Sequence, residues 1–328
     1  MPHSLIHRHT LYDLIHHTAV RYPHKTAVIE GKTRWTYLEW DIAIQNTAHF
    51  LARHDLQKGS KIAVYARNSA QYATLIFAAA HLGAVLVPIN FMLSPQEIAY
   101  ILTHCQADSV ISDSNLTLPL DAARTYMPSA SAASWQHRRF VTSVPPISPD
   151  VPEGWTLLPL TLNPAEIPYH QQIMGPDNED LAQILYTSGT ESRPKGAMLS
   201  HSNLIAEYVS VIVDGGFSPD DVVLHALPFY HSAQQHVFLG PYTYLGATHV
   251  IISAPRPDAI LSTIAEERVT EFFAPPTVWI SLLRSPLFDQ SDLSSLVKGH
   301  YGASIMPKEI LQELSRRLPR TQFWNFYG

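Results

Sequence analysis

Cysteine is almost missing from this chain, which has one, Cys105, among 328 residues. A single thiol cannot form an internal disulfide, and it excludes a zinc site built from several cysteines. This cysteine usage is typical of a reducing compartment, so we expect a cytoplasmic protein. The first ten residues carry His3, His7, Arg8 and His9 and contain no continuous apolar run. They therefore do not resemble a signal peptide.

Charge is also scarce, because Asp, Glu, Lys and Arg make up only 15% of the residues. The 28 acidic side chains outnumber the 22 basic ones, which gives a formal net charge of −6. This balance gives no indication of a nucleic-acid surface. The 18 histidines include no HExxH motif and no cluster with carboxylates. We therefore interpret the histidines scattered through the first 54 residues, such as His16 and His17, as surface histidines and expect no metal centre there.

Long apolar runs are missing as well. The nearest approach to a membrane span is 72–93, which is interrupted by His81, Gly83, Pro88 and Asn90. A hydrocarbon core would penalise these residues. The segment is better interpreted as a soluble helix over 70–82, ended by a left-handed glycine, followed by a buried strand over 84–89. We therefore expect no transmembrane segment.

The alternation of helical and strand periodicity predicts an α/β fold with mainly parallel sheets flanked by helices. Helices are expected at 11–21, 37–54, 70–82, 95–105, 202–213, 237–244, 258–267, 277–284 and 307–317. Strands are expected at 27–29, 34–37, 61–65, 84–89, 109–112, 222–226, 248–252, 269–273, near 300 and at 322–326. Between 119 and 176 the chain is rich in Pro, Ser and Ala, which indicates a surface excursion of loops with one or two strands.

One loop between a strand and a helix carries most of the functional information. Residues 186–196 read Tyr-Thr-Ser-Gly-Thr-Glu-Ser-Arg-Pro-Lys-Gly. Hydroxyls and backbone N–H groups can surround phosphate oxygens, and a lysine can neutralise their charge. The loop is not a Walker A motif, because no hydroxyl residue follows Lys195, so a kinase or GTPase would lack its magnesium ligand. The simplest alternative is a solvated turn.

This loop resembles the phosphate loop of the adenylate-forming, or AMP-binding, superfamily, which includes acyl-CoA synthetases, firefly luciferases and peptide-synthetase adenylation domains. Three later segments resemble the same family in the same order: 227–231 (Leu-Pro-Phe-Tyr-His), 301–307 (Tyr-Gly-Ala-Ser-Ile-Met-Pro) and 325–328 (Asn-Phe-Tyr-Gly). The stretch 80–90 also resembles a family segment. Two departures are visible, since Ser192 and Tyr301 stand where the family usually has glycine.

The resemblance implies a fold and a set of site residues. The fold would be the large N-terminal domain of the acyl-adenylate-forming enzymes, with lobes at 60–213, which includes the phosphate loop, and at 11–56 with 220–328. His231, Lys195 and Thr190 would act in catalysis, and Thr190 would also contact Mg²⁺. Without the family resemblance, His231 would be interpreted as a structural residue. ATP would be bound by Thr187, Ser188, Gly189, Thr190, Lys195, Gly196, Gly302, Ala303, Ser304, Asn325, Phe326, Tyr327 and Gly328.

The implied reaction joins a carboxylic acid to coenzyme A, with ATP, Mg²⁺ and coenzyme A as the small-molecule partners. The carboxylate attacks the α-phosphorus, pyrophosphate leaves, and the thiol then displaces AMP. Residues 232–239 contain no Lys or Arg to pair with a second acidic group, and they include the apolar run 237–239. A medium- or long-chain fatty acid is therefore the first choice, an aryl acid the second and an amino acid the third. The oligomeric state stays open.

Members of the family continue beyond the position that corresponds to Gly328. Their additional residues include the main carboxylate that binds magnesium and a C-terminal lid domain. We therefore expect this chain to be an incomplete N-terminal domain with little full turnover. A non-catalytic remnant that only binds nucleotide is the alternative.

Overall fold

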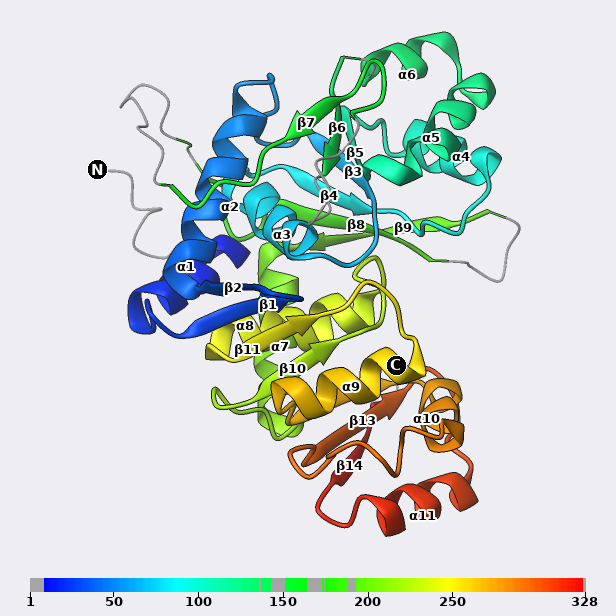
Figure 1. The fold of residues 1–328 in the computed structure, drawn as a ribbon. Coiled ribbons are helices and arrows are strands. Elements are labelled where there is room, and N and C mark those ends of the chain that lie inside the picture. The colour runs from blue at the N-terminus through cyan, green and yellow to red at the C-terminus, as the bar shows by residue number, and fades with distance from the viewer. Residues whose placement is uncertain are drawn as a thin grey trace.

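The chain folds into two seven-stranded sheets with helices between them and on both outer faces (Figure 1). The computed structural model describes residues 9–135, 137–142, 151–163, 173, 175–187 and 193–326. All strand pairs are parallel except one at an edge of each sheet. The predicted α/β class with mainly parallel sheets is confirmed. The assignment of particular residues to two lobes stays a prediction.

The upper sheet in Figure 1 is built from one continuous part of the chain. Its strand order is β7-β6-β5-β3-β4-β8-β9, and β8 and β9 form its antiparallel pair. The strands are β3 Lys61–Tyr65, β4 Val85–Pro88, β5 Ser109–Asp113, β6 Arg139–Thr142, β7 Thr156–Leu158, β8 Leu181–Thr187 and β9 Lys195–Ser200.

The lower sheet combines the beginning of the chain with its last third. Its order is β14-β13-β12-β10-β11-β1-β2, and the antiparallel hairpin β1–β2 joins the sheet through β11. The strands are β1 Thr26–Glu30, β2 Thr33–Thr36, β10 Val222–His225, β11 Thr248–Ile251, β12 Glu271–Ala274, β13 Lys298–Gly302 and β14 Gln322–Phe326.

The largest hydrophobic core lies in the helical layer between the sheets. Trp40 is at its centre: its indole N–H donates to Thr74 Oγ1 at 3.1 Å, and its ring packs edge-to-face on Phe77. This layer contains α1 Leu11–Arg21, α2 Tyr37–Ala52, α3 Ala70–Leu82, α7 His201–Asp214, a π-helix Ala233–Leu239 and α8 Gly240–Leu245. The outer faces are covered by α4 Pro95–His104, α5 Thr117–Ala123 and α6 Ser129–Ser134 above, and by α9 Pro257–Glu267, α10 Pro276–Arg284 and α11 Lys308–Arg317 below.

Local sequence explains where several of these helices begin and end. Helices α1, α2, α4 and α7 each begin with a capping box, in which a Ser or Thr hydroxyl accepts from a backbone N–H three residues on and that residue's side chain accepts in return. Gly83 ends α3 with φ +74°, the left-handed conformation predicted for it.

Two sequence predictions about the upper sheet are wrong. The region after 119 is not a surface excursion, because β6 and β7 extend the sheet and both Trp135 and Phe140 are fully buried. The phosphate loop does not lead directly into a helix, because strand β9 intervenes and pairs with β8. Strand β9 escaped prediction because its apolar residues are few and lie among exposed positions, whereas β6 and β7 are the one or two strands expected between 119 and 176.

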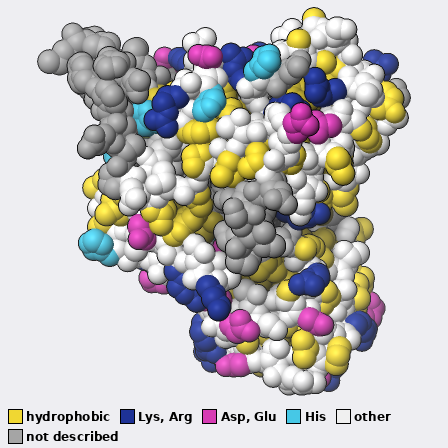
Figure 2. Space-filling model, turned by 45° about the horizontal axis from the view of Figure 1, so that its top comes forward, with side chains coloured by type: hydrophobic (Ala, Val, Ile, Leu, Met, Phe, Trp, Pro, Cys, Tyr) yellow, Lys and Arg dark blue, Asp and Glu magenta, His cyan; other side chains and the backbone are white. Residues whose placement is uncertain are grey.

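No helix in the described part of the chain combines the length and the apolar character that crossing a membrane requires. The same residues contain no group of three or more His, Cys, Asp or Glu side chains arranged to hold a metal ion. Basic and acidic side chains are interspersed over the face shown in Figure 2.

Candidate active site

The two ends of the phosphate loop are brought together by the antiparallel pair β8–β9. Thr187, the last residue of β8, lies directly opposite Lys195, the first residue of β9. Both side chains are exposed and can meet a ligand at the mouth of the hairpin. Ser188, Gly189 and Thr190 lie outside the described residues.

Helix α4 holds the phosphate loop on both sides. Before the loop, Tyr186 Oη and His104 Nδ1 are hydrogen-bonded at 2.6 Å. After it, Tyr100 Oη donates to the carbonyl of Pro194 at 3.1 Å, and the guanidinium of Arg193 lies 5.8 Å from the centre of the Tyr100 ring. Because Tyr100 and His104 are four residues apart, they share one face of α4. One rigid helix thus fixes both ends of the loop.

Gly196 provides space beneath the loop. A Cβ at this position would lie 2.7 Å from Ile184 Cγ2, so any larger residue would push the two strands apart. The structure therefore gives Gly196 a packing role, and its predicted contact with ATP stays a prediction.

A cavity of about 330 Å³ lies beside the loop. It brings Thr187 and His231, which are 44 positions apart in the sequence, to one site, and the imidazole of His231 is exposed there. The cavity is lined by Pro88, Asn90, Leu93, Glu97, Ile101, Leu185, Tyr186, Thr187, Pro194, Tyr230, His231 and Ser232. Helix α4 contributes both the carboxylate of Glu97 and the apolar side chain of Ile101 to this lining.

The segment that carries His231 is clamped by Asn68, a residue that the sequence analysis missed. Asn68 Nδ2 donates to the carbonyl of Leu227 at 2.7 Å, and its Oδ1 accepts from the backbone N–H of Phe229 at 2.8 Å. Asn68 is 3% exposed and follows β3 of the upper sheet, so it ties the His231 segment to that sheet. The only signal in the sequence is an Asn-Ser pair between a strand and a helix, which is normally interpreted as a helix cap.

Replacing Asn68 by Ala is expected to lower the free energy of unfolding by about 3 kcal/mol, because two buried backbone groups lose their partners at ~1–3 kcal/mol each. Chemical denaturation measures this loss. Asn115→Ala is the matched control, since Asn115 accepts only an exposed hydrogen bond from Arg67, and it should cost under ~0.5 kcal/mol. An equal loss of unfolding free energy in the two variants would contradict the stabilising role of the two Asn68 hydrogen bonds.

The second group of predicted residues meets at the ends of β13 and β14. Gly302 lies opposite Phe326, and Tyr301 lies opposite Asn325. A Cβ on Gly302 would collide with the carbonyl oxygen of Phe326, so only glycine fits there. Ala303 follows with φ +64°, and it and Ser304 are exposed.

The side chains of Tyr301 and Asn325 differ in their exposure. The ring of Tyr301, at the position where the family usually has glycine, is partly buried against the core beneath α9, α10 and α11. The side chain of Asn325 is exposed. Tyr327 and Gly328 lie outside the described residues.

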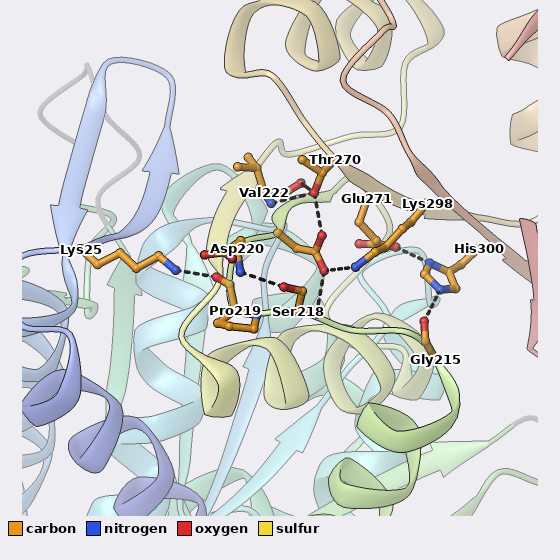
Figure 3. Close-up of polar contacts among 11 residues, drawn as sticks. Lys25, Gly215, Ser218, Pro219, Asp220, Val222, Thr270, Glu271, Lys298 and His300 are labelled. Atoms are coloured by element: carbon orange, nitrogen blue, oxygen red, sulfur yellow. Dashed lines mark hydrogen bonds and ion pairs between the residues drawn. The ribbon is translucent and has the colours of Figure 1, made fainter. Parts of the chain in front are cut away.

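A buried polar network supports strand β13, which leads to Gly302 (Figure 3). His300 Nδ1 is 2.8 Å from Glu271 Oε1, and its Nε2–H donates to the carbonyl of Gly215 at 3.2 Å. Both side chains are fully buried. Two residues earlier, Lys298 Nζ donates to Asp221 at 2.6 Å. Burial raises the pKa of Glu271, and the hydrogen bond from His300 acts in the opposite direction.

Residues 15–328 match the family model described as AMP-binding enzyme. The chain belongs to the AMP-binding enzyme family. The resemblance carried by the four motifs is therefore confirmed.

This AMP-binding protein is similar to feruloyl-CoA synthase from Amycolatopsis, with 30% identity over 88% of the chain and 53% of that protein. It is 28% identical to indoleacetate–CoA ligase from Aromatoleum aromaticum, over 92% of the chain and 57% of that protein. The crystal structure of the N-terminal domain of FACL13 from Mycobacterium tuberculosis shares its fold, with a TM-score of 0.81 and 21% identity over 98% of the chain and 76% of that structure. The chain spans about half the length of the curated relatives it matches.

In this AMP-binding protein the predicted residues form two neighbouring groups. Thr187 and His231 flank one cavity, and Gly302 adjoins Phe326 at the edge of the lower sheet. The π-helix that follows His231 connects the groups, because the ring of its residue Phe238 packs edge-to-face on Phe326 at 5.7 Å. The ends of β8 and β13 lie on the same side of the molecule in Figure 1.

Proposed function

We propose that this AMP-binding protein uses ATP to activate a carboxylic acid as an acyl-adenylate and passes the acyl group to coenzyme A. The observation that carries the proposal is the family match over 15–328, in which Thr187 and Lys195 form the mouth of the phosphate loop. The names of its relatives agree with this reaction, since they include a feruloyl-CoA synthase and an indoleacetate–CoA ligase.

In this proposal Thr187 and Lys195 hold the outer phosphates of ATP, and the ammonium group of Lys195 offsets the charge that gathers there as pyrophosphate leaves. Gly302, Ala303 and Asn325 hold adenine. His231, at the mouth of the cavity, orients the acid and excludes water.

Magnesium would arrive with ATP. Mg²⁺ in nucleotide sites is bound mainly by phosphate oxygens and water, with one or two protein ligands. This agrees with the described residues, which provide no cage of three or more His, Cys, Asp or Glu side chains. The contact predicted for Thr190 lies outside those residues.

The class of acid is the finer part of the proposal. Leu93, Ile101 and Leu185 line the cavity, and Glu97 is the one Asp, Glu, Lys or Arg among the described residues that line it, so an uncharged apolar acyl group fits better than a second anion. A fatty acid stays the first choice from the sequence. An aryl acid is the second candidate, and the names of the two relatives favour it.

The proposal predicts that ATP binds and that pyrophosphate is released only when a suitable acid is present. Calorimetry with ATP, followed by a pyrophosphate assay with hexanoate, palmitate, ferulate and indoleacetate, tests both steps. Lys195→Met should weaken ATP binding at least about tenfold, because a charge-assisted contact is lost. Lys58→Met is the control, since Lys58 contacts Asp180 on the surface, and it should leave binding unchanged. Binding of ATP without pyrophosphate release for any acid would favour the binding-only alternative, and no binding would reject both.

A further inference from the structure

The helix that directly follows His231 has an unusual geometry. Residues Ala233–Leu239 form a π-helix, and the backbone N–H of Gln235 donates to the carbonyl of His231 at 3.2 Å. π-helical turns are rare and occur frequently at functional sites. The backbone of His231 is thereby joined to the first turn of this helix, so whatever fixes the helix also fixes His231.

Gln235 ties this helix to the upper sheet. Its Oε1 accepts from Nε2 of Gln183, in strand β8, at 3.0 Å. Gln183 Oε1 in turn accepts from His236, whose Nδ1 accepts from the hydroxyl of Tyr208 at 3.1 Å. All four side chains are at most 2% exposed. The side-chain oxygen of Gln183 accepts from His236, and the side-chain N–H of Gln183 can only donate. Gln235 is therefore required as the acceptor of that N–H.

Gln234, the adjacent residue, ties the same helix to the lower sheet. Its Nε2 donates to Nδ1 of His225 at 2.6 Å, and His225 Nε2 donates to Nδ1 of His249 at 2.9 Å. His249 Nε2 then donates to the hydroxyl of Thr243 at 3.1 Å, which donates to the carbonyl of Leu239 at 2.7 Å. A carbonyl can only accept, so every direction in this chain of hydrogen bonds is fixed and Gln234 is required as a donor.

We propose that Gln234 and Gln235 are positioning residues that hold His231 in a fixed place between the strand leading to the phosphate loop and the sheet that carries Gly302. Two neighbouring buried amides with opposite hydrogen-bonding roles are anchored in opposite sheets. Apolar residues could fill the same volume, but hydrogen bonds with fixed donor and acceptor roles specify one arrangement of the helix. Gln234 Oε1 is buried without a hydrogen-bond partner among the described residues, so the contribution of Gln234 rests on its amide N–H alone. The consequence for catalysis rests on the proposed function.

The kinetic test compares Gln235→Met with Gln71→Met. Gln71 is an equally buried glutamine, 2% exposed, whose Nε2 donates to the carbonyl of Leu158 at 2.8 Å. Gln235→Met should lower kcat for acid-dependent pyrophosphate release by about 10- to 100-fold, because displacement of a reacting group by 1 Å can cost 10²-fold, while KM for ATP stays within about threefold. Gln71→Met should leave kcat within about twofold. Equal kcat values for the two variants would overturn the proposal.

Conservative variants separate positioning from folding. Gln235→Glu keeps an acceptor and should recover most of the kcat lost in Gln235→Met, whereas Gln234→Glu replaces the donating amide by an acceptor facing His225 Nδ1 and should lose kcat. Full activity of Gln234→Glu, or failure of Gln235→Glu to recover activity, would overturn the assigned roles.

A second readout does not depend on activity. The ring resonances of His231, assigned by their loss in His231→Asn, should shift in Gln235→Met and stay unchanged in Gln71→Met. If the wild-type protein releases no pyrophosphate with any acid, the proposed function is wrong. The positioning of His231 is then decided by the His231 ring resonances alone. An unshifted His231 resonance in Gln235→Met would overturn it.

Discussion

Lowering the pH from 7 to 5.5 is expected to remove about 4 kcal/mol of unfolding free energy through three buried histidines. Burial lowers the pKa of His236 and of His249 to about 3, and that of His225 well below its usual value. In the unfolded chain each has a pKa of about 6.5, so below that pH the unfolded state binds more protons. The contribution of these histidines to the unfolding free energy is complete above pH 6.5 and declines as the pH falls towards 3. The decline is about 1.4 kcal/mol per pH unit for each histidine.

Urea unfolding at pH 7 and at pH 5.5 measures this loss. Buried carboxyl groups with raised pKa values, such as Asp113 and Glu30, act in the opposite direction. The decisive quantity is therefore the difference between wild type and His236→Gln, in which the carboxyl contributions cancel. Glutamine can still donate to Gln183, and it should reduce the acid-induced loss by about 1.3 kcal/mol, the share of one histidine. An unchanged loss in His236→Gln would mean that this imidazole is not held neutral by burial.

Replacing Glu271 by Leu is expected to lower the free energy of unfolding by about 3–5 kcal/mol, the range for removing one member of a buried ion pair. His300 would keep its bond to Gly215 but lose its partner at Nδ1. Glu271→Gln should cost less, because its side-chain amide can both donate and accept and so keeps a hydrogen-bonding partner at His300 Nδ1. The double variant Glu271→Leu/His300→Phe should recover part of the loss, since no buried imidazole is then left with an unpartnered Nδ1, although the carbonyl of Gly215 loses its donor.

A double-mutant cycle in urea isolates the coupling between the two residues. The exposed pair of Arg34 and Glu267 is the control, and Glu267→Gln should cost under about 1 kcal/mol. A Glu271→Leu cost as small as that of Glu267→Gln would contradict the importance of the buried pair.

Local features of the fold were largely predictable from sequence. The helix start marked by Ser94, the cap at Gly83 and the buried strand after it depend on neighbouring residues, so sequence patterns specify them. Strand β9 was not predictable, because it is held by pairing with β8 and not by an apolar pattern of its own, and the exact bounds of β6 depend on its pairing with β5. A short strand is stabilised chiefly by its neighbours.

The candidate site was predictable only in part. Its motif residues, including Thr187, His231 and Gly302, follow parallel strands at their carboxyl ends, where open α/β sheets bind ligands. Asn68 and Gln183 hold these motif residues in place, but no sequence pattern indicates that role. A buried amide is recognisable only from the partners that the fold brings to it.

The position of the β1–β2 hairpin has a consequence for how the chain folds during synthesis. The upper sheet uses residues 61–200 only and can form before the rest of the chain emerges. Val28 in β1 pairs with His249 in β11, so the hairpin reaches its place only after the ribosome has made β11. Until then the apolar side chains of Ala27, Val28 and Ile29 lack the strand that covers them, which exposes the nascent chain to aggregation. Strand β1 thus waits for a partner strand that is synthesised more than 200 residues later.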